Sequence, residues 1–119
     1  MATSIIEQKK KGVETFTLTL ASGISTGEGY GIYDKASGTV RINFWYNNGN
    51  TAIPATDALF TVPQDYRPSE YELGSGMYWV PTNSLCAGAQ SRVNTNGTIV
   101  QSNSGAKTRG FGYIEYVIG

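Results

Sequence analysis

Two groups of aromatic and hydrogen-bonding side chains are the best candidates for chemistry in this sequence, and the chemistry they suit is ligand binding. Saccharides present apolar C–H faces bordered by hydroxyl groups. Their sites therefore combine an aromatic platform with side chains that donate and accept hydrogen bonds. The two groups are Trp79, Tyr78, Asn83 and Gln90, and Trp45, Arg41, Asn47 and Asn48. For each tryptophan, packing in the core or between subunits is the alternative to ligand binding.

Side chains suited to catalysis are scarce. The chain has no histidine, which removes the commonest general base and the Ser-His and Cys-His pairs of nucleophilic enzymes. Glu70 and Glu72 are spaced so that both would lie on one side of a strand, but no surrounding pattern indicates the deep cleft of a glycosidase. Oxygen ligands recur at no metal-binding spacing. We therefore expect no catalytic residue, no metal ion and no cofactor.

Glycines 23, 27, 29 and 31 form a cluster that superficially looks like a phosphate-binding loop. The run GEGYGI lacks the third glycine of GxGxxG, and no Lys-Ser or Lys-Thr pair follows it. We interpret these glycines as turn and bulge residues. Cys86, the single cysteine, is predicted to be a small buried residue because Leu85 and Ala87 flank it.

Composition indicates one all-β domain. The chain has 119 residues, which suffice for a single core. Nine basic and nine acidic residues give zero net charge, which argues against a nucleic-acid partner. Fifteen glycines and eight tyrosines indicate tight turns and strands. Residues 1–12 are predicted to be a linker or stalk-joining arm and residues 13–119 the domain. No apolar run approaches the length of a membrane span, so we expect no membrane insertion.

Alternation of apolar and polar residues predicts the strands. In the stretch 39–46, Val40, Ile42, Phe44 and Tyr46 would share one face. A turn at 35–38 and the Asn96-Gly97 turn predict two hairpins. Residues 21–29 are expected to be loop, and 74–76 a short or bulged hairpin. The predicted strands are 14–20, 30–34, 39–46, 58–62, 71–73, 77–80, 85–94, 98–102 and 110–118.

The last predicted strand is apolar on both faces. Phe111, Tyr113, Glu115 and Val117 would lie on one side and Ile114, Tyr116 and Ile118 on the other, so both sides are largely apolar. A strand with one face in water should have one polar face, so the second apolar face indicates a partner surface, such as another copy of the chain. A central strand covered by loops is the alternative.

The stretch 56–69, TDALFTVPQDYRPS, combines an apolar strand with a rigid turn, because Pro63 and Pro68 cannot continue a ladder. A strand ending in Val-Pro, then a polar pair and Tyr-Arg-Pro-Ser, resembles the C-terminal head domains of bacteriophage tail-fibre and baseplate receptor-binding proteins. GYGIY at 29–33, RVNTNG at 92–97 and the aromatic last strand fit the same pattern. The resemblance covers roughly residues 15–119. The segment 72–81 departs from it.

This resemblance implies an antiparallel β-sandwich, jelly-roll-like, that forms a homotrimer at the distal end of a phage tail. The implied partners are a host cell-surface saccharide, other copies of the chain and other phage tail proteins, with no catalysis. A trimerising cap or decoration module without its own ligand is the alternative. A polysaccharide-cleaving tail tip is a third, weaker possibility.

Overall fold

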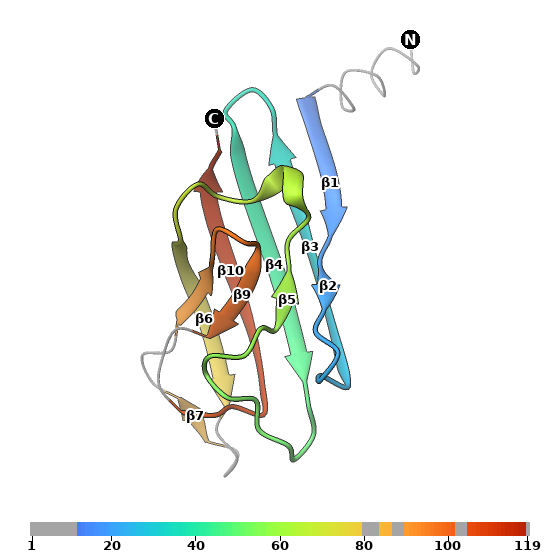
Figure 1. Ribbon diagram of the computed structural model, residues 1–119, viewed down its shortest axis with the longest axis vertical. Coiled ribbons are helices and arrows are strands. Elements are labelled where there is room, and N and C mark those ends of the chain that lie inside the picture. Colours follow the sequence, from blue (N-terminus) through green and yellow to red (C-terminus); the bar gives the residue numbers. More distant parts are fainter. Residues whose placement is uncertain (1–11, 80–83, 87–89, 102–104, 119) are drawn as a thin grey trace.

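The computed structural model describes residues 12–79, 84–86, 90–101 and 105–118, and its strands form a single sheet (Figure 1). One short 3-10 helix, η1 (Gln64–Tyr66), follows Pro63. The strands are β1 (Val13–Thr17), β2 (Thr19–Leu20), β3 (Thr26–Asp34), β4 (Thr39–Asn47), β5 (Phe60–Thr61), β6 (Glu72–Trp79), β7 (Leu85–Cys86), β8 (Gln90–Val93), β9 (Thr98–Gln101) and β10 (Arg109–Val117). The all-β prediction is confirmed.

The sheet is antiparallel and nearly closes into a barrel. Its strand order is β1-β3-β4-β10-β6-β8-β9-β5-β2, and β7 pairs with β6 beside this path. The two ends of the path are β1 and β2, which Leu18 joins in the chain. The Leu18 amide donates to the Gly29 carbonyl of β3 at 2.8 Å, while β2 pairs with β5. The predicted sandwich, a double-sheet jelly roll, therefore differs from the structure, in which one sheet wraps around the core.

Most predicted strands and both predicted hairpins are confirmed. The stretch 14–20 forms β1 and β2, and 110–118 corresponds to β10. The β3–β4 turn contains Gly38 at φ 72°, and the β8–β9 turn contains Gly97 at φ 88°. Glycine suits both positions because side chains rarely tolerate positive φ. Asn96 supports the second turn, since its side-chain oxygen accepts the Thr98 amide at 3.1 Å.

The prediction that residues 74–76 form a hairpin is wrong, because β6 runs through them. Gly74 and Gly76 have no positive φ and instead allow close packing. An added Cβ at Gly74 would lie 2.7 Å from Ile114, and one at Gly76 would lie 2.6 Å from the ring of Tyr78. The backbone of β10 at Gly74, and side chains at both glycines, thus occupy the space that a Cβ would need.

The prediction that residues 21–29 are loop fails at its end, because β3 begins at Thr26. Gly27, Gly29 and Gly31 are neither turn nor bulge residues. They are inward positions of β3 that receive Leu20, Leu18 and Phe16 from the closing strands, each within 2.9 Å of an added Cβ. Of the four clustered glycines only Gly23 lies in a turn.

The core fills the barrel and is rich in aromatic rings. Phe16 stacks on Tyr66 of η1 with centroids 4.2 Å apart, and Phe44 packs on Phe60 at 5.4 Å. In the predicted strand 58–62 only Phe60 and Thr61 are paired as β5, and Pro63 ends the extended run as expected. The buried hydrophobic residues are Phe16, Leu18, Ile24, Val40, Ile42, Phe44, Tyr46, Ile53, Leu59, Phe60, Val62, Tyr78, Val93, Ile99, Ile114 and Tyr116.

We call the two ends of the barrel upper and lower, as they are drawn in Figure 1. At the upper end β1 begins and β10 ends, beside the β3–β4 turn; at the lower end β4 ends and β10 begins (Figure 1). The predicted arm lies outside the described residues except for Gly12, and so does residue 119 at the other terminus.

Candidate binding face on the outside of the barrel

Exposed hydrophobic side chains gather on one side of the barrel. In the described part of the chain, all ten large ones lie on β1, β3, β4, β6, β7 or β10, or directly before β6. We call the outer surface of these strands the apolar side. Its residues are Val13, Tyr30, Ile32, Trp45, Tyr71, Leu73, Met77, Leu85, Phe111 and Val117, each 40–62% exposed. Exposed large hydrophobic side chains concentrated on neighbouring strands are typical of an interaction surface.

Strand register arranges the centre of the apolar side in two cross-strand rows. In the first, which we call the aromatic row, Phe111 of β10 lies opposite Trp45 of β4 and Met77 of β6. In the second, the polar row, Tyr113 of β10 lies opposite Asn43 and Ser75 on the same two strands.

A cleft of about 410 Å³ lies between these two rows. Phe111 and Met77 line one wall, and Asn43, Tyr113 and Ser75 line the other. Its floor contains Gly76 and Gly112, which face each other in register. A Cβ at Gly112 would point inward, 2.5 Å from the Phe44 ring, so the outward surface there is bare backbone. The cleft therefore joins an apolar wall to a hydrogen-bonding wall.

A charged pair stands behind the polar wall. The Tyr113 hydroxyl donates to Glu115 Oε1 at 2.7 Å, and Arg41 Nε donates to the same oxygen at 3.0 Å. The hydrogen bond from Tyr113, and next the one from Arg41, lower the pKa of Glu115 below its ordinary value. The same carboxylate raises the pKa of Tyr113. Tyr113 thus stays protonated, and its oxygen lone pairs remain able to accept a hydrogen bond from a ligand.

A tryptophan and an arginine flank the apolar wall. The Trp79 ring lies 5.8 Å from that of Phe111, and the Arg109 guanidinium lies over Trp79 at 4.5 Å. Arg109 is opposite both Trp79 and Asn47 in register, so these three form a further row at the lower end. Stacking of this kind orients the indole ring.

The structure brings the two predicted groups onto one face. Trp45 and Asn47 come from β4 and Trp79 from β6, with β10 between them. Arg41 is exposed on the same side of β4, two rows above Trp45. Gln90 is exposed on β8 and lies opposite Ser75, so it continues the polar row. Five of the eight predicted binding residues therefore share the outer surface around the cleft.

Two predicted binding residues face the protein itself. Tyr78 is fully buried, because it points to the opposite face of β6 from Trp79. Its hydroxyl lies 2.7 Å from Ser91 Oγ, and burial raises the pKa of Tyr78 to about 12. Asn48 is buried and braces a loop, where it accepts the Ser25 amide and donates to the Thr51 carbonyl. Neither belongs to the surface that Trp79 and Trp45 share, and Asn83 lies outside the described residues.

The prediction did not select the residues that line the cleft. Asn43, Ser75, Met77, Phe111 and Tyr113 form its two walls. The signal for Phe111 and Tyr113 was the double apolar pattern of the last strand. Ser75 gave none because it lay in the predicted 74–76 hairpin, and Met77 gave none because it was expected to begin a separate strand after that hairpin.

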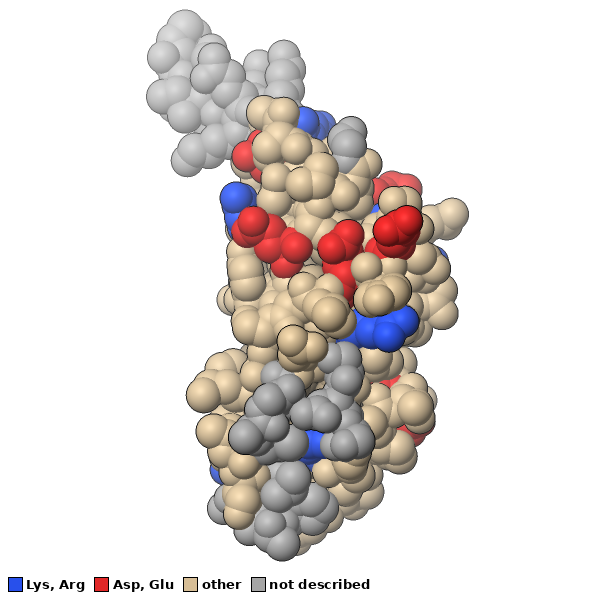
Figure 2. Space-filling model, turned by 90° about the vertical axis from the view of Figure 1, so that its left-hand side faces the viewer, with Lys and Arg blue, Asp and Glu red and all other residues tan. Residues whose placement is uncertain are grey.

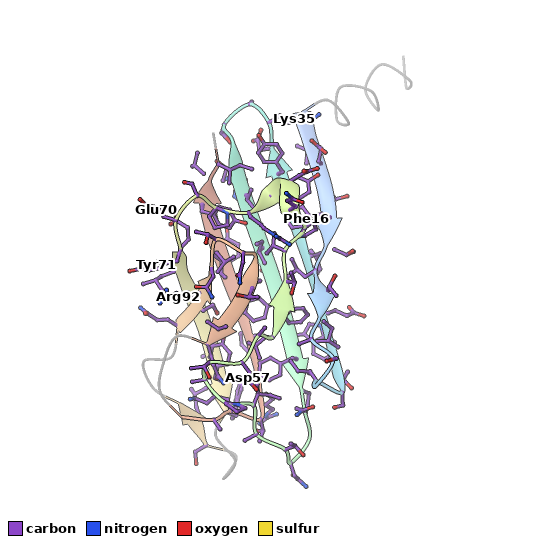
Figure 3. All side chains as sticks on the ribbon, viewed as in Figure 1. Phe16, Lys35, Asp57, Glu70, Tyr71 and Arg92 are labelled. Carbon is purple, nitrogen blue, oxygen red and sulfur yellow. The ribbon has the colours of Figure 1, made fainter. Side chains whose placement is uncertain are left out.

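Charged and aromatic side chains also lie outside the cleft, on the side of the barrel formed by β6 and β8. Viewed from that side, acidic side chains form a band across the upper half of the molecule (Figure 2). Glu70, Tyr71 and Arg92 lie together on its outer side (Figure 3), with the Arg92 guanidinium 3.9 Å from the Tyr71 ring centre. Among the described residues, no group of three His, Cys, Asp or Glu side chains could hold a metal ion. No helix in the same residues is long and apolar enough to cross a membrane.

Comparison with known proteins gives no family for the chain. No family model matches it, and no curated protein matches it either.

Proposed function

We propose that this domain is a non-catalytic adhesion head of a phage tail, which binds a host cell-surface saccharide in the cleft of the apolar side. The observation that carries the proposal is the cleft itself, with Phe111 and Met77 on one wall and Asn43, Tyr113 and Ser75 on the other. Sugar rings need this combination of an apolar face and hydrogen-bonding groups. The phage context rests on the sequence resemblance around Val62–Pro63 and Tyr66–Ser69.

Binding in this cleft requires no group to change its charge. A sugar ring would place its C–H face on Phe111, while its hydroxyl groups would bond to Asn43 and Ser75. Tyr113 would accept a hydrogen bond from the sugar, because its own proton is directed to Glu115. Trp79 would stiffen the wall behind Phe111.

We also propose that the head acts as a homotrimer and that its contacts lie in the upper half of the apolar side. Four of the five exposed hydrophobic side chains there are aliphatic, Val13, Ile32, Leu73 and Val117, and the fifth is Tyr71. Those around the cleft are mainly aromatic or methionine. This half is the end at which β1 begins, so the stalk-joining arm would enter beside the contacts (Figure 1). Three weak sites on one head would act together through multivalency.

The second candidate is a self-associating cap or decoration module without a ligand. The concentration on one side of all ten large exposed hydrophobic side chains of the described residues favours it, because self-association alone would cover such a surface. Under that function the cleft would be buried between copies.

Binding to a printed array of bacterial surface glycans, together with adsorption to a panel of bacterial strains, tests the proposed function. We expect the native protein to bind at least one glycan, and Phe111→Ala to weaken that binding about tenfold or more, since aromatic anchors dominate interfaces. The matched control is Tyr71→Ala, which removes a similarly exposed aromatic ring outside the cleft (54% exposed, against 46% for Phe111). A folded protein that binds no glycan would favour the cap module. Glycan binding that Phe111→Ala leaves intact would overturn the cleft as the binding site.

A further inference from the structure

The polar row extends well beyond the cleft. Thr17 of β1 is paired with Tyr30 of β3, and Tyr30 with Asn43 of β4. At the other end Ser75 is paired with Gln90 of β8. The complete row is Thr17, Tyr30, Asn43, Tyr113, Ser75 and Gln90. At an inter-strand spacing of about 4.8 Å it runs about 24 Å across six strands.

A second cleft lies between the same two rows. It has a volume of about 340 Å³ and is lined by Thr17, Glu28 and Tyr30 together with Leu18, Gly27 and Gly29. Glu28 is paired with Trp45, so it extends the aromatic row onto β3, the strand from which Tyr30 extends the polar row. Like the first cleft, this one has two glycines in its lining.

The two clefts are aligned across the strands. The first is centred on β10 and β6 and the second on β3 and its junction with β1, so β4 lies between them. Their separation is between two and a half and three strand spacings, or about 13 Å. A single sugar ring is too short to occupy both clefts, whereas a linear chain of several rings laid across the strands can do so.

The charges along this track favour a neutral ligand. All six side chains of the polar row are uncharged hydroxyls, amides or phenols. Arg41 and Glu115, in the next row, neutralise each other through the 3.0 Å ion pair. Among the residues that line the two clefts, Glu28 is the charged one, and its carboxylate would repel an anionic polymer.

We propose that the ligand is a neutral linear polysaccharide, bound through internal rings that lie across β3, β4, β10 and β6 and occupy both clefts. This inference rests on the proposed saccharide-binding function and adds the length, direction and charge of the ligand. Recognition of internal rings leaves both ends of the polymer free, so the head can bind anywhere along a chain.

The test uses the full-length protein and an array of linear oligosaccharide ladders, one to eight rings long. Neutral ladders (β-glucan, chito-, manno- and galacto-oligosaccharides) are printed beside anionic ones (hyaluronate and polygalacturonate). We expect a neutral ladder to bind with an affinity that rises up to several rings. Tyr30→Ala should weaken binding of the long members about tenfold and leave the short members unchanged, because it removes a wall of the second cleft only. Tyr71→Ala, the matched control, should change neither.

Three results would overturn the inference and leave the proposed function standing. These are binding that saturates at one ring, binding confined to anionic ladders, and a Tyr30→Ala effect of equal size on short and long members. Failure of the native, folded protein to bind any glycan on either array would overturn both proposals together.

Discussion

The two sides of the barrel have equally buried inner faces but very different outer ones. On β9 and β5 the inward residues Ile99 and Phe60 are fully buried, as are Ile42 and Ile114 on β4 and β10. The outward positions of β5 and β9 hold Thr61, Thr98 and Val100, all partly covered. None of the ten exposed large hydrophobic side chains of the described residues lies there.

This difference shows that the outer hydrophobic residues of the apolar side are not required for the core. An antiparallel sheet folds with one apolar face, and the side formed by β9 and β5 follows that rule. The four exposed aromatic rings of the apolar side present about 400 Å² on their own, at about half of ~200 Å² each. We infer that contact with other molecules, rather than folding, explains this surface.

The largest effect is expected from charging the upper half of the apolar side. Leu73→Lys combined with Val117→Lys should convert the proposed trimer to a monomer, because lysines desolvated in an interface oppose association. Light scattering during size-exclusion chromatography should give a mass of three times 12.8 kDa for the native chain and 12.8 kDa for the variant.

The matched control adds the same two charges to the opposite side, as Thr61→Lys with Val100→Lys. It should remain a trimer. A native protein that is monomeric at every concentration would contradict the proposed trimer. A control variant that dissociates equally would contradict the placement of the trimer contacts on the apolar side.

An effect of intermediate size is expected from substitutions at two neighbouring residues of β6, one on its outer face and one on its inner face. Trp79→Ala should weaken glycan binding several-fold with little loss of stability, because Trp79 supports Phe111 from the outside. Tyr78→Phe should leave binding unchanged and lower the free energy of unfolding by about 1 kcal/mol, since it deprives Ser91 of a buried partner. Glycan titration and urea unfolding measure the two. The reverse pattern would contradict the assignment of ligand binding to the outer face.

The smallest effect concerns pH. Glu115 has a lowered pKa, so its support of the polar wall is complete at neutral pH and is lost as the pH falls through that lowered value. Tyr113 has a raised pKa and stays protonated into the alkaline range. Glycan affinity should therefore be flat around neutrality and decline modestly in acid.

Arg41→Met should shift that decline to higher pH, because it removes the second of the two groups that lower the pKa of Glu115. The measurement is glycan affinity from about pH 8 to about pH 3. An affinity that falls equally in Glu115→Gln, which has no carboxylate to protonate, would show that Glu115 has no part in the effect.

Local sequence patterns were enough to predict most strands. Alternation in β4 correctly assigned Val40, Ile42, Phe44 and Tyr46 to the core, and glycine-containing turns located both hairpins. The errors at Gly74–Gly76 and at the start of β3 share one cause. A glycine required by a distant side chain has the same local sequence signal as a glycine required by a turn.

The candidate site was predictable in its residue types but not in its assembly. Trp45 and Trp79 were placed in separate groups because only the pairing of each strand with β10 unites them. Tyr78 was misplaced for a simpler reason: consecutive residues of a strand face opposite ways, so it could not share a surface with Trp79. The closure of a single sheet, in place of two layers, depends on the pairing of β2 with β5, which no local pattern specifies.

The glycines of β3 align the seam of the barrel. The inner surface of β3 has three successive gaps, at Gly27, Gly29 and Gly31. These gaps are filled by the side chains of Leu20, Leu18 and Phe16, respectively. A shift of one residue in the pairing register would direct threonines into the gaps and expose the three hydrophobic side chains to water. A shift of two residues would leave one gap empty. The absence of side chains at these three glycines thus fixes the pairing register of β1 and β2 against β3. A mutational scan should find these three glycines among the least replaceable positions of the chain.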